Sequence, residues 1–261
     1  MVHPADQRAI VGAVKSVRTA LSVFEIVAEL QPVGLSAIAR RLEVPKTTVQ
    51  RSLTALAEAG WLVPQLGNSG RWTVSARFAV LTNTAPAALT TREVARPHLA
   101  ALRELTGETV SLFTIEGSRM VMLDGVESRH AVRVVEQEVG PLPIHVSAAG
   151  RAMIAARPPE QRRTAVEQLG RAKLLRYTER SVVDTKELLR RINIAARVGY
   201  AVVDREYLDD LSAVGAAVLA GLTPVAGVAL LGPSYRLTPG SFAEMGGRVA
   251  ACAARIGAEL G

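Results

Sequence analysis

Apolar side chains follow a helical rhythm near the start of the chain. Between residues 14 and 30, Val17, Leu21, Phe24 and Ala28 recur at steps of three and four positions. This spacing places them on one side of a helix and predicts an amphipathic helix over the segment.

Two shorter helices are predicted next. Ser36 can accept a hydrogen bond from the first unpaired N–H groups of a helix of about two turns. Pro45 suits the start of a further helix, over residues 46–59, because its missing N–H costs nothing there. Gly60 ends that helix, since glycine tolerates the left-handed backbone that follows a helix. The side expected to be buried carries Val49, Leu53 and Leu56.

A hairpin is predicted directly after the three helices. Residues 61–63 and 71–74 read as strands, and the polar, glycine-containing segment 65–70 separates them. Residues 75–91 are alanine-rich helical sequence with a break at Ala85-Pro86. We interpret this stretch as the connector between two domains.

The rest of the chain mixes strands with helices. Residues 211–235 form the longest uncharged run, but the turn-like segment 221–224 divides it, so we expect two buried strands and no membrane span. Asp184 with Glu187, and Ser241 with Glu244, have the spacing of helix-capping pairs. The other expected strands are 110–115, 120–123, 131–135 and 199–203, and the expected helices are 93–105, 149–156, 159–169, 185–198 and a C-terminal helix.

Composition narrows the class of protein. The chain has 261 residues, 49% of them hydrophobic, which is enough for a sizeable core. Its one cysteine, Cys252, excludes an internal disulfide and a structural zinc site, and its place on an apolar helix side predicts a packing role. Residues 1–10 include Asp6 and have no apolar core of a signal peptide. We therefore expect a cytoplasmic protein.

The charge points to a polyanion as partner. The formal net charge is +7, and residues 1–78 hold nine basic against five acidic side chains, so the N-terminal third is the more basic per residue. Residues 35–54 have the arrangement of a helix-turn-helix, with a short helix, a tight turn and a helix whose outer side is short and polar. The alternative is a three-helix bundle with a solvated polar side.

The helix-turn-helix interpretation assigns roles to named side chains. Short threonines admit close approach to base edges, while Gln50 and Arg51 can reach base or phosphate oxygens. Lys46, and Arg71 in the hairpin acting as a wing, would contact phosphate. The expected DNA-binding residues are Ser36, Lys46, Thr47, Thr48, Gln50, Arg51, Thr54 and Arg71.

Several separated motifs give the chain a resemblance to a known family. They occur at residues 35–53, 95–99, 106–110, 142–152, 176–178 and 199–206. In this order they resemble the winged helix-turn-helix and effector-binding domain of the IclR family of transcriptional regulators. The resemblance implies an α+β protein with a winged helix-turn-helix at residues 14–76, a linker helix at 77–91, and a GAF-like antiparallel sheet flanked by helices at 92–261.

The resemblance also implies an effector pocket. The pocket residues that the resemblance implies for this chain are Leu142, His145, Ala148, Ala149, Gly150, Asp204, Leu211, Ala213, Ala229 and Leu231. A helix N-terminus at Ala149-Gly150 would favour a carboxylate. The chain departs from the family pattern with Gly150-Arg151 in place of Gly-Lys, with Ala213 in place of a cysteine or serine, and with no serine in the last strand. We therefore expect an aromatic or otherwise apolar acid.

Other constellations carry little chemistry. The four histidines have no partner at metal-binding spacing, and we expect no metal, no cofactor and no catalytic residue. The acidic residues Asp204, Glu206 and Asp209-Asp210 are interpreted as a solvated loop, and Arg190-Arg191 as exposed helix charges.

The sequence thus predicts a regulator that binds a double-stranded DNA operator as a homodimer or dimer of dimers. A small-molecule effector would modulate its DNA affinity, and the family resemblance favours repression over activation. Two alternatives stay open: a ligand-sensing module that binds protein, and an enzyme acting on an organic acid.

Overall fold

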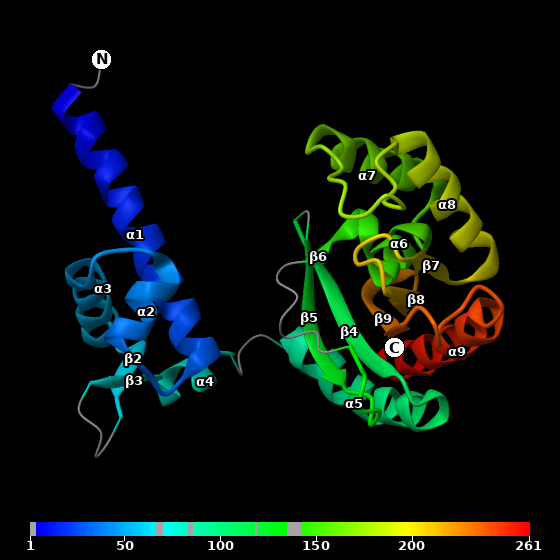
Figure 1. Ribbon diagram of the computed structural model, residues 1–261, viewed down its shortest axis with the longest axis horizontal. Helices are drawn as coiled ribbons and strands as arrows, with labels where there is room; N and C mark the ends of the chain where they lie inside the picture. The colour runs from blue at the N-terminus through cyan, green and yellow to red at the C-terminus, as the bar shows by residue number, and fades with distance from the viewer. Residues whose placement is uncertain (1–3, 66–69, 83–85, 118, 135–141) are drawn as a thin grey trace. The chain divides into compact units, whose positions relative to one another are not determined.

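A computed structural model describes residues 4–65, 70–82, 86–117, 119–134 and 142–261. The chain divides into two compact units, residues 1–86 and 87–261 (Figure 1). Each unit has a core of its own.

The first unit is helical with a small antiparallel sheet. Its elements are α1 (Pro4–Leu30), β1 (Val33–Gly34), α2 (Leu35–Leu42), α3 (Lys46–Glu58), β2 (Leu62–Pro64), β3 (Arg71–Val74) and α4 (Ala76–Thr82). The strand order is β1-β3-β2. The predicted three helices and hairpin are confirmed, and the short β1 extends the hairpin to three strands.

The buried side of α1 differs from the predicted one. Val17 and Leu21 are 59% and 56% exposed, whereas Val23, Ile26 and Val27 are buried against α2 and α3. Both strips of the helix are apolar, so periodicity alone could not tell which strip the neighbouring helices cover.

The start of α2 also differs from expectation. Gly34 is the residue that precedes α2, and no side chain caps this helix, so Ser36 lies within its first turn and is exposed. The start of α3 agrees with the prediction, because Pro45 immediately precedes it. Gly60 follows α3 with a φ of 77°, the left-handed conformation that glycine adopts without strain.

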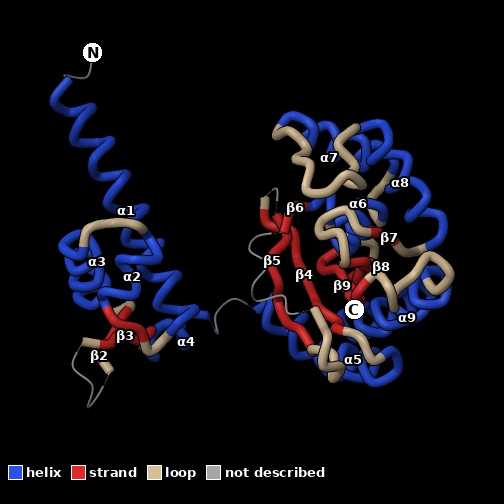
Figure 2. The backbone as a smooth tube through the Cα atoms, viewed as in Figure 1, coloured by secondary structure: helices blue, strands red, loops and turns tan. Residues whose placement is uncertain are grey.

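The second unit is a six-stranded antiparallel sheet with helices on both faces (Figure 2). Its order is β6-β5-β4-β9-β8-β7. The strands are β4 (Thr109–Glu116), β5 (Arg119–Val126), β6 (Leu142–Pro143), β7 (Ala201–Asp204), β8 (Leu211–Ala220) and β9 (Thr223–Pro233). The helices are α5 (Pro86–Thr106), the 3₁₀ turn η2 (Ile144–Val146), α6 (Ala148–Ala155), α7 (Pro159–Arg171), α8 (Thr185–Val198) and α9 (Phe242–Leu260).

Alternation along the strands creates two cores, one on each face of the sheet. On β8, Ala213 packs with α6 and α8, while Val214 packs with α5 and α9. Cys252 of α9 is fully buried in the second core, and burial raises the pKa of its thiol to about 11. This confirms the packing role expected for Cys252.

The long apolar run forms β8 and β9 as predicted, in register from Leu211 opposite Pro233 to Ala220 opposite Thr223. Among the described helices, none combines the length and apolar character that crossing a bilayer requires. Asp184 caps α8, since its Oδ1 accepts a hydrogen bond of 2.8 Å from the N–H of Glu187.

Two further predictions are wrong. Residues 131–134 form no strand, and residue 135 lies outside the described residues. Instead, Arg236 donates to the carbonyl of Val132 and Thr109 to that of Val134, so side chains hold this segment as a loop. Ser241 precedes α9, but its hydroxyl donates to the carbonyl of Thr238 and does not cap the helix.

The packing of α6 on the sheet depends on Gly215. A Cβ on this residue would lie 2.5 Å from the backbone of Ala148 and Ala149, too close for any side chain. We expect Gly215→Ala to destabilise the protein by about 1–3 kcal/mol, because α6 must move away from β8. Urea unfolding measures this loss.

A matched control is Gly247→Ala on α9, where a Cβ would meet no atom within 4 Å. This change should be neutral or stabilising by up to about 1 kcal/mol, since alanine favours a helix over glycine. Equal effects of the two substitutions would contradict the role given to Gly215.

Candidate DNA interface and effector cavity

The turn between α2 and α3 is short and held by the backbone. Glu43 has a left-handed φ of 54°, and the N–H of Val44 donates to the carbonyl of Ala39 at 3.2 Å. Val49 and Leu53 of α3 are fully buried against α1 and α2. The opposite side of α3 is thereby fixed toward solvent.

The exposed side of α3 carries the predicted DNA-binding residues. Thr48 is half-buried and the others are exposed: Lys46, Thr47, Gln50, Arg51 and Thr54. In the part of the chain that the structure describes, none of these six side chains forms an ion pair or hydrogen bond with another residue. The polar atoms of the α3 surface are therefore available to a partner.

Arg71 is the first residue of β3 and lies at the turn end of the hairpin, as predicted, while residues 66–69 lie outside the described residues. The guanidinium of Arg71 is exposed, and its Nη1 donates to the carbonyl of Pro32 at 3.0 Å. One of its five N–H groups thus anchors β3 to the segment before β1.

The second unit contains a narrow cavity between the sheet and the start of α6. Its free volume is about 20 Å³, and its wall is almost entirely apolar. The lining residues are Phe113, Leu142, Val146, Ser147, Ala148, Val203, Tyr207, Leu211, Ala213, Ala229 and Leu231. Six residues expected from the family resemblance lie in this wall: Leu142, Ala148, Leu211, Ala213, Ala229 and Leu231.

Four other expected residues do not line the cavity. Asp204 is held by the Ser212 hydroxyl at 2.9 Å and by Arg180 at 3.0 Å. Ala149 packs on Gly215, and the N–H of Gly150 donates to the Ser147 hydroxyl at 3.1 Å. The Ser147 cap thus already satisfies one of the N–H groups that a carboxylate was expected to use.

His145, the fourth of them, is buried beside the cavity. Its Nε2 lies 2.9 Å from the carbonyl of Leu175, and its ring stands 6.1 Å from that of Tyr177. Burial lowers the pKa of His145 below its ordinary value of 6.5, while the contact with the Leu175 carbonyl opposes this shift.

Five lining residues were not anticipated from the sequence: Phe113, Val146, Ser147, Val203 and Tyr207. Tyr207 packs against Tyr177 in a tilted arrangement, with ring centroids 5.0 Å apart. Burial raises the pKa of the Tyr207 phenol. The neutral hydroxyl of Tyr207 is thus a hydrogen-bond donor at an apolar wall. The sequence signal that could have identified Tyr207 is that it directly follows Glu206, the last residue of the 199–206 motif.

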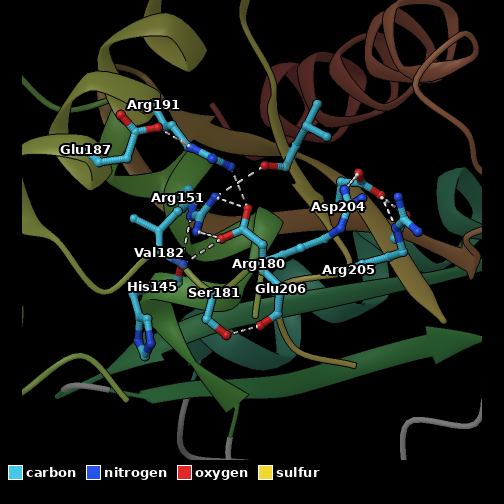
Figure 3. A network of polar contacts seen from close by, with 12 residues as sticks. His145, Arg151, Arg180, Ser181, Val182, Glu187, Arg191, Asp204, Arg205 and Glu206 are labelled. Atoms are coloured by element: carbon cyan, nitrogen blue, oxygen red, sulfur yellow. Dashed lines mark hydrogen bonds and ion pairs between the residues drawn. The ribbon is translucent and has the colours of Figure 1, made fainter. Parts of the chain in front are cut away.

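Arg151 of α6 and Glu206, the residue before Tyr207, form a buried ion pair (Figure 3). Each side chain is 1% exposed, and two nitrogens of Arg151 contact both carboxylate oxygens of Glu206. The Nε of Arg151 donates to the carbonyl of His145 at 2.7 Å. Arg191 of α8 adds a second cation, 2.9 Å from Oε1 of Glu206. The network joins α6, α8 and the segment after β7.

Two sequence interpretations are corrected here. Glu206 is not part of a solvated acidic loop, and Arg191 is not a free surface charge. The cause is Arg151, the residue that departs from the family pattern. A buried guanidinium requires a carboxylate partner, because an unpaired charge in the interior costs several kcal/mol. Among the described residues, no group of three His, Cys, Asp or Glu side chains is placed to hold a metal ion.

An outward polar helix on a helix-turn-helix, followed by a hairpin wing, defines the class: a winged helix-turn-helix transcriptional regulator. The family model for the IclR helix-turn-helix domain matches residues 16–65, and that for the bacterial transcriptional regulator IclR C-terminal domain matches residues 85–258. The chain belongs to the IclR family.

Curated relatives align with this chain over most of their length. The transcriptional repressor IclR of Escherichia coli K12 is 28% identical over 94% of this chain and 89% of its own. The repressor AllR of the same strain is 30% identical over 87% of this chain and 83% of its own length. Both relatives are transcriptional repressors.

Solved structures share the fold. The Thermotoga maritima IclR structure aligns with a TM-score of 0.73 at 21% identity, covering 95% of this chain and 99% of that one. An IclR homolog from Microbacterium hydrocarbonoxydans, complexed with 4-hydroxybenzoate, aligns with a TM-score of 0.76 at 21% identity. This alignment covers 94% of this chain and 98% of that one.

The lowered pKa of His145 makes stability depend on pH. Below pH 6.5 an unfolded imidazole takes up a proton that the buried ring resists. The unfolded state then binds more protons, so stability falls as the pH drops through this range. We expect the urea midpoint to fall between pH 7.5 and pH 5.5, and to fall less in His145→Gln. Equal losses in both proteins would contradict this assignment.

Proposed function

We propose that this protein regulates transcription by binding a pseudo-palindromic DNA operator, as a homodimer or a dimer of dimers. The single observation that carries this proposal is the α3 surface, whose polar side chains are exposed and unengaged. Two-fold symmetry of the protein would match that of the operator. The repressors among its relatives support repression as the mode of regulation.

The proposed roles follow from reach and charge. Thr47, Thr48, Gln50 and Arg51 are nearest the bases, because the N-terminal part of a recognition helix enters the major groove. Lys46 and Arg71 contact phosphates. Ser36 and Thr54 flank this surface on α2 and α3. A protein with these partners works in the cytoplasm and needs no catalytic residue, cofactor or metal.

Replacing Arg51 tests the recognition surface. Arg51→Ala should weaken specific operator binding by about 5- to 150-fold, since one good base contact contributes about 1–3 kcal/mol. The thermal unfolding midpoint should stay unchanged, because Arg51 is exposed. Fluorescence anisotropy with DNA from upstream of the gene measures the affinity at several salt concentrations.

The control is Glu58→Ala, an exposed change at the other end of α3. It should leave specific binding unchanged, apart from a small gain from the lost negative charge. Retention of full operator affinity by Arg51→Ala would overturn the assignment of α3.

We further propose that a small organic acid binds the cavity and changes the affinity for DNA. The wall is apolar except for Ser147 and Tyr207, which favours an aromatic or otherwise apolar acid over a small polar one. The 4-hydroxybenzoate-bound homolog supports an aromatic ligand. The present free volume suits about one water molecule, so the acid must displace the wall. Tyr207 and Leu211 are the half-buried lining residues nearest the β7–β8 turn.

Calorimetry separates the ligand classes. Benzoate and 4-hydroxybenzoate should bind with at least about tenfold higher affinity than pyruvate or glyoxylate, because burying a ring is worth several kcal/mol of apolar transfer. The matched control is Ala213→Leu, which fills the cavity and should abolish binding while the protein stays folded. Tight binding of an oxo-acid and none of the aromatic acids would contradict this ligand class.

A further inference from the structure

Most of the net charge of the chain resides in one segment of the second unit. Residues 157–197 hold eleven basic and five acidic side chains, a net charge of +6 against +7 for the whole chain. The segment comprises α7, α8 and their connection. The charge imbalance therefore lies on this helix pair and the residues that flank and connect its helices, as well as on the DNA-binding unit.

The two helices form the outer layer of their side of the domain (Figure 1). They run antiparallel. Gly170 at the end of α7 abuts Thr185 at the start of α8, while Arg162 bonds to Asn193 at 3.1 Å near their other ends. Because α6 lies between this layer and the sheet, the far side of both helices faces solvent.

Ion pairing leaves a surplus of cations on this layer. Five of its arginines have acidic partners: Arg163, Arg176, Arg180, Arg190 and Arg191. The acidic side chain of Asp184 caps α8 and forms no ion pair with these arginines. Six basic side chains have no acidic partner among the described residues: Arg157, Arg162, Arg171, Lys173, Lys186 and Arg197.

These six cations form two groups. Arg171, Lys173 and Lys186 lie within three residues of Gly170 or Thr185, which meet at this end, and all three are exposed. Arg157, Arg162 and Arg197 belong to the other end, where Arg162 bonds to the carbonyl of Arg157 and Arg197 lies one turn after Asn193. At 1.5 Å per residue along α7 the groups are about 14 Å apart. Measured along the axis of a DNA duplex, this length spans about four base pairs at about 3.4 Å each.

Helix stability does not explain the whole arrangement. Arg171 in the last turn of α7 interacts favourably with the helix dipole, but Lys186 lies in the first turn of α8, where the dipole disfavours a cation. A free lysine at that end, beside two other cations, raises the repulsion within the group. A bound polyanion relieves this repulsion.

We propose that this α7–α8 face is a second DNA-contacting surface, which binds the sugar–phosphate backbone of duplex DNA without reading its sequence. The inference rests on the proposed DNA-binding function and extends it to the effector-binding domain. Arginine forks match phosphate oxygens. The four exposed cations of the two groups can neutralise several phosphates: Arg171, Lys173, Lys186 and Arg197.

The test removes one group of cations from the full-length protein. The variant Arg171→Ala/Lys173→Ala/Lys186→Ala is compared with Arg119→Ala/Arg129→Ala/Arg255→Ala, which removes three exposed arginines elsewhere in the same domain. Fluorescence anisotropy with a random 40-base-pair duplex measures affinity between 50 and 200 mM salt. Circular dichroism confirms that both variants fold.

We expect the α7–α8 variant to lose on the order of tenfold in affinity at 100 mM salt. The slope of log K against log [salt] should fall by about 2 to 3, since each lost phosphate contact contributes about 0.9. The control variant should change the slope by less than about 1. Equal changes in the two variants, or no change in either, would overturn the proposal.

Two further outcomes separate this inference from the proposed function. If Arg51→Ala loses operator binding while the α7–α8 variant keeps wild-type affinity and slope, the regulator stands and the second surface does not. Retention of DNA binding with loss of binding to heparin would indicate an acidic protein partner and also overturn the proposal. If the wild-type protein binds no duplex at all, both proposals fail.

Discussion

The second unit, which matches the IclR C-terminal domain, is organised around two opposite charges that have no access to water. Arg151 and Glu206 are each 1% exposed, and their pairing is stable only with two-point contact and further hydrogen bonds. Those contacts come from α6, from η2 through the His145 carbonyl, and from α8 through Arg191. The pair thus fixes how three helical segments and the end of β7 meet.

The cavity is a consequence of that arrangement. Gly215 lets α6 approach the sheet closely, and the small side chains of Ala213 and Ala229 leave the gap that becomes the cavity. Tyr207 follows the buried Glu206 in the chain, so the ion pair and the cavity wall share a segment. Any ligand that moves Tyr207 acts directly on the segment that the charged network holds. Differential binding to two states of this segment is the physical requirement for control of DNA affinity.

The sequence predicted those structural features whose signal lies in neighbouring residues of the chain. Asp184 marked the start of α8, and Gly221 divided β8 from β9 within the apolar run. Long-range features were out of reach. Glu206 is buried because of Arg151, 55 residues away in sequence, and an acidic loop without that partner reads as solvated. Helix α1 has two apolar strips, and the packing of α2 and α3 on one of them leaves Val17, on the other, exposed. Six of the ten residues expected from the family motifs line the cavity, while Tyr207, which also lines it, was not among them.

The distribution of aromatic side chains makes the two units optically distinct. Both tryptophans, Trp61 and Trp72, belong to the DNA-binding unit, and Trp61 packs against Phe24 with ring centroids 6.1 Å apart. The four tyrosines all belong to the second unit: Tyr177, Tyr200, Tyr207 and Tyr235. Indole absorbs at longer ultraviolet wavelengths than phenol, so tryptophan fluorescence can be excited without exciting tyrosine. A change in that emission when a small acid binds the second unit is therefore a signal that has crossed from one unit to the other, recorded without any attached dye.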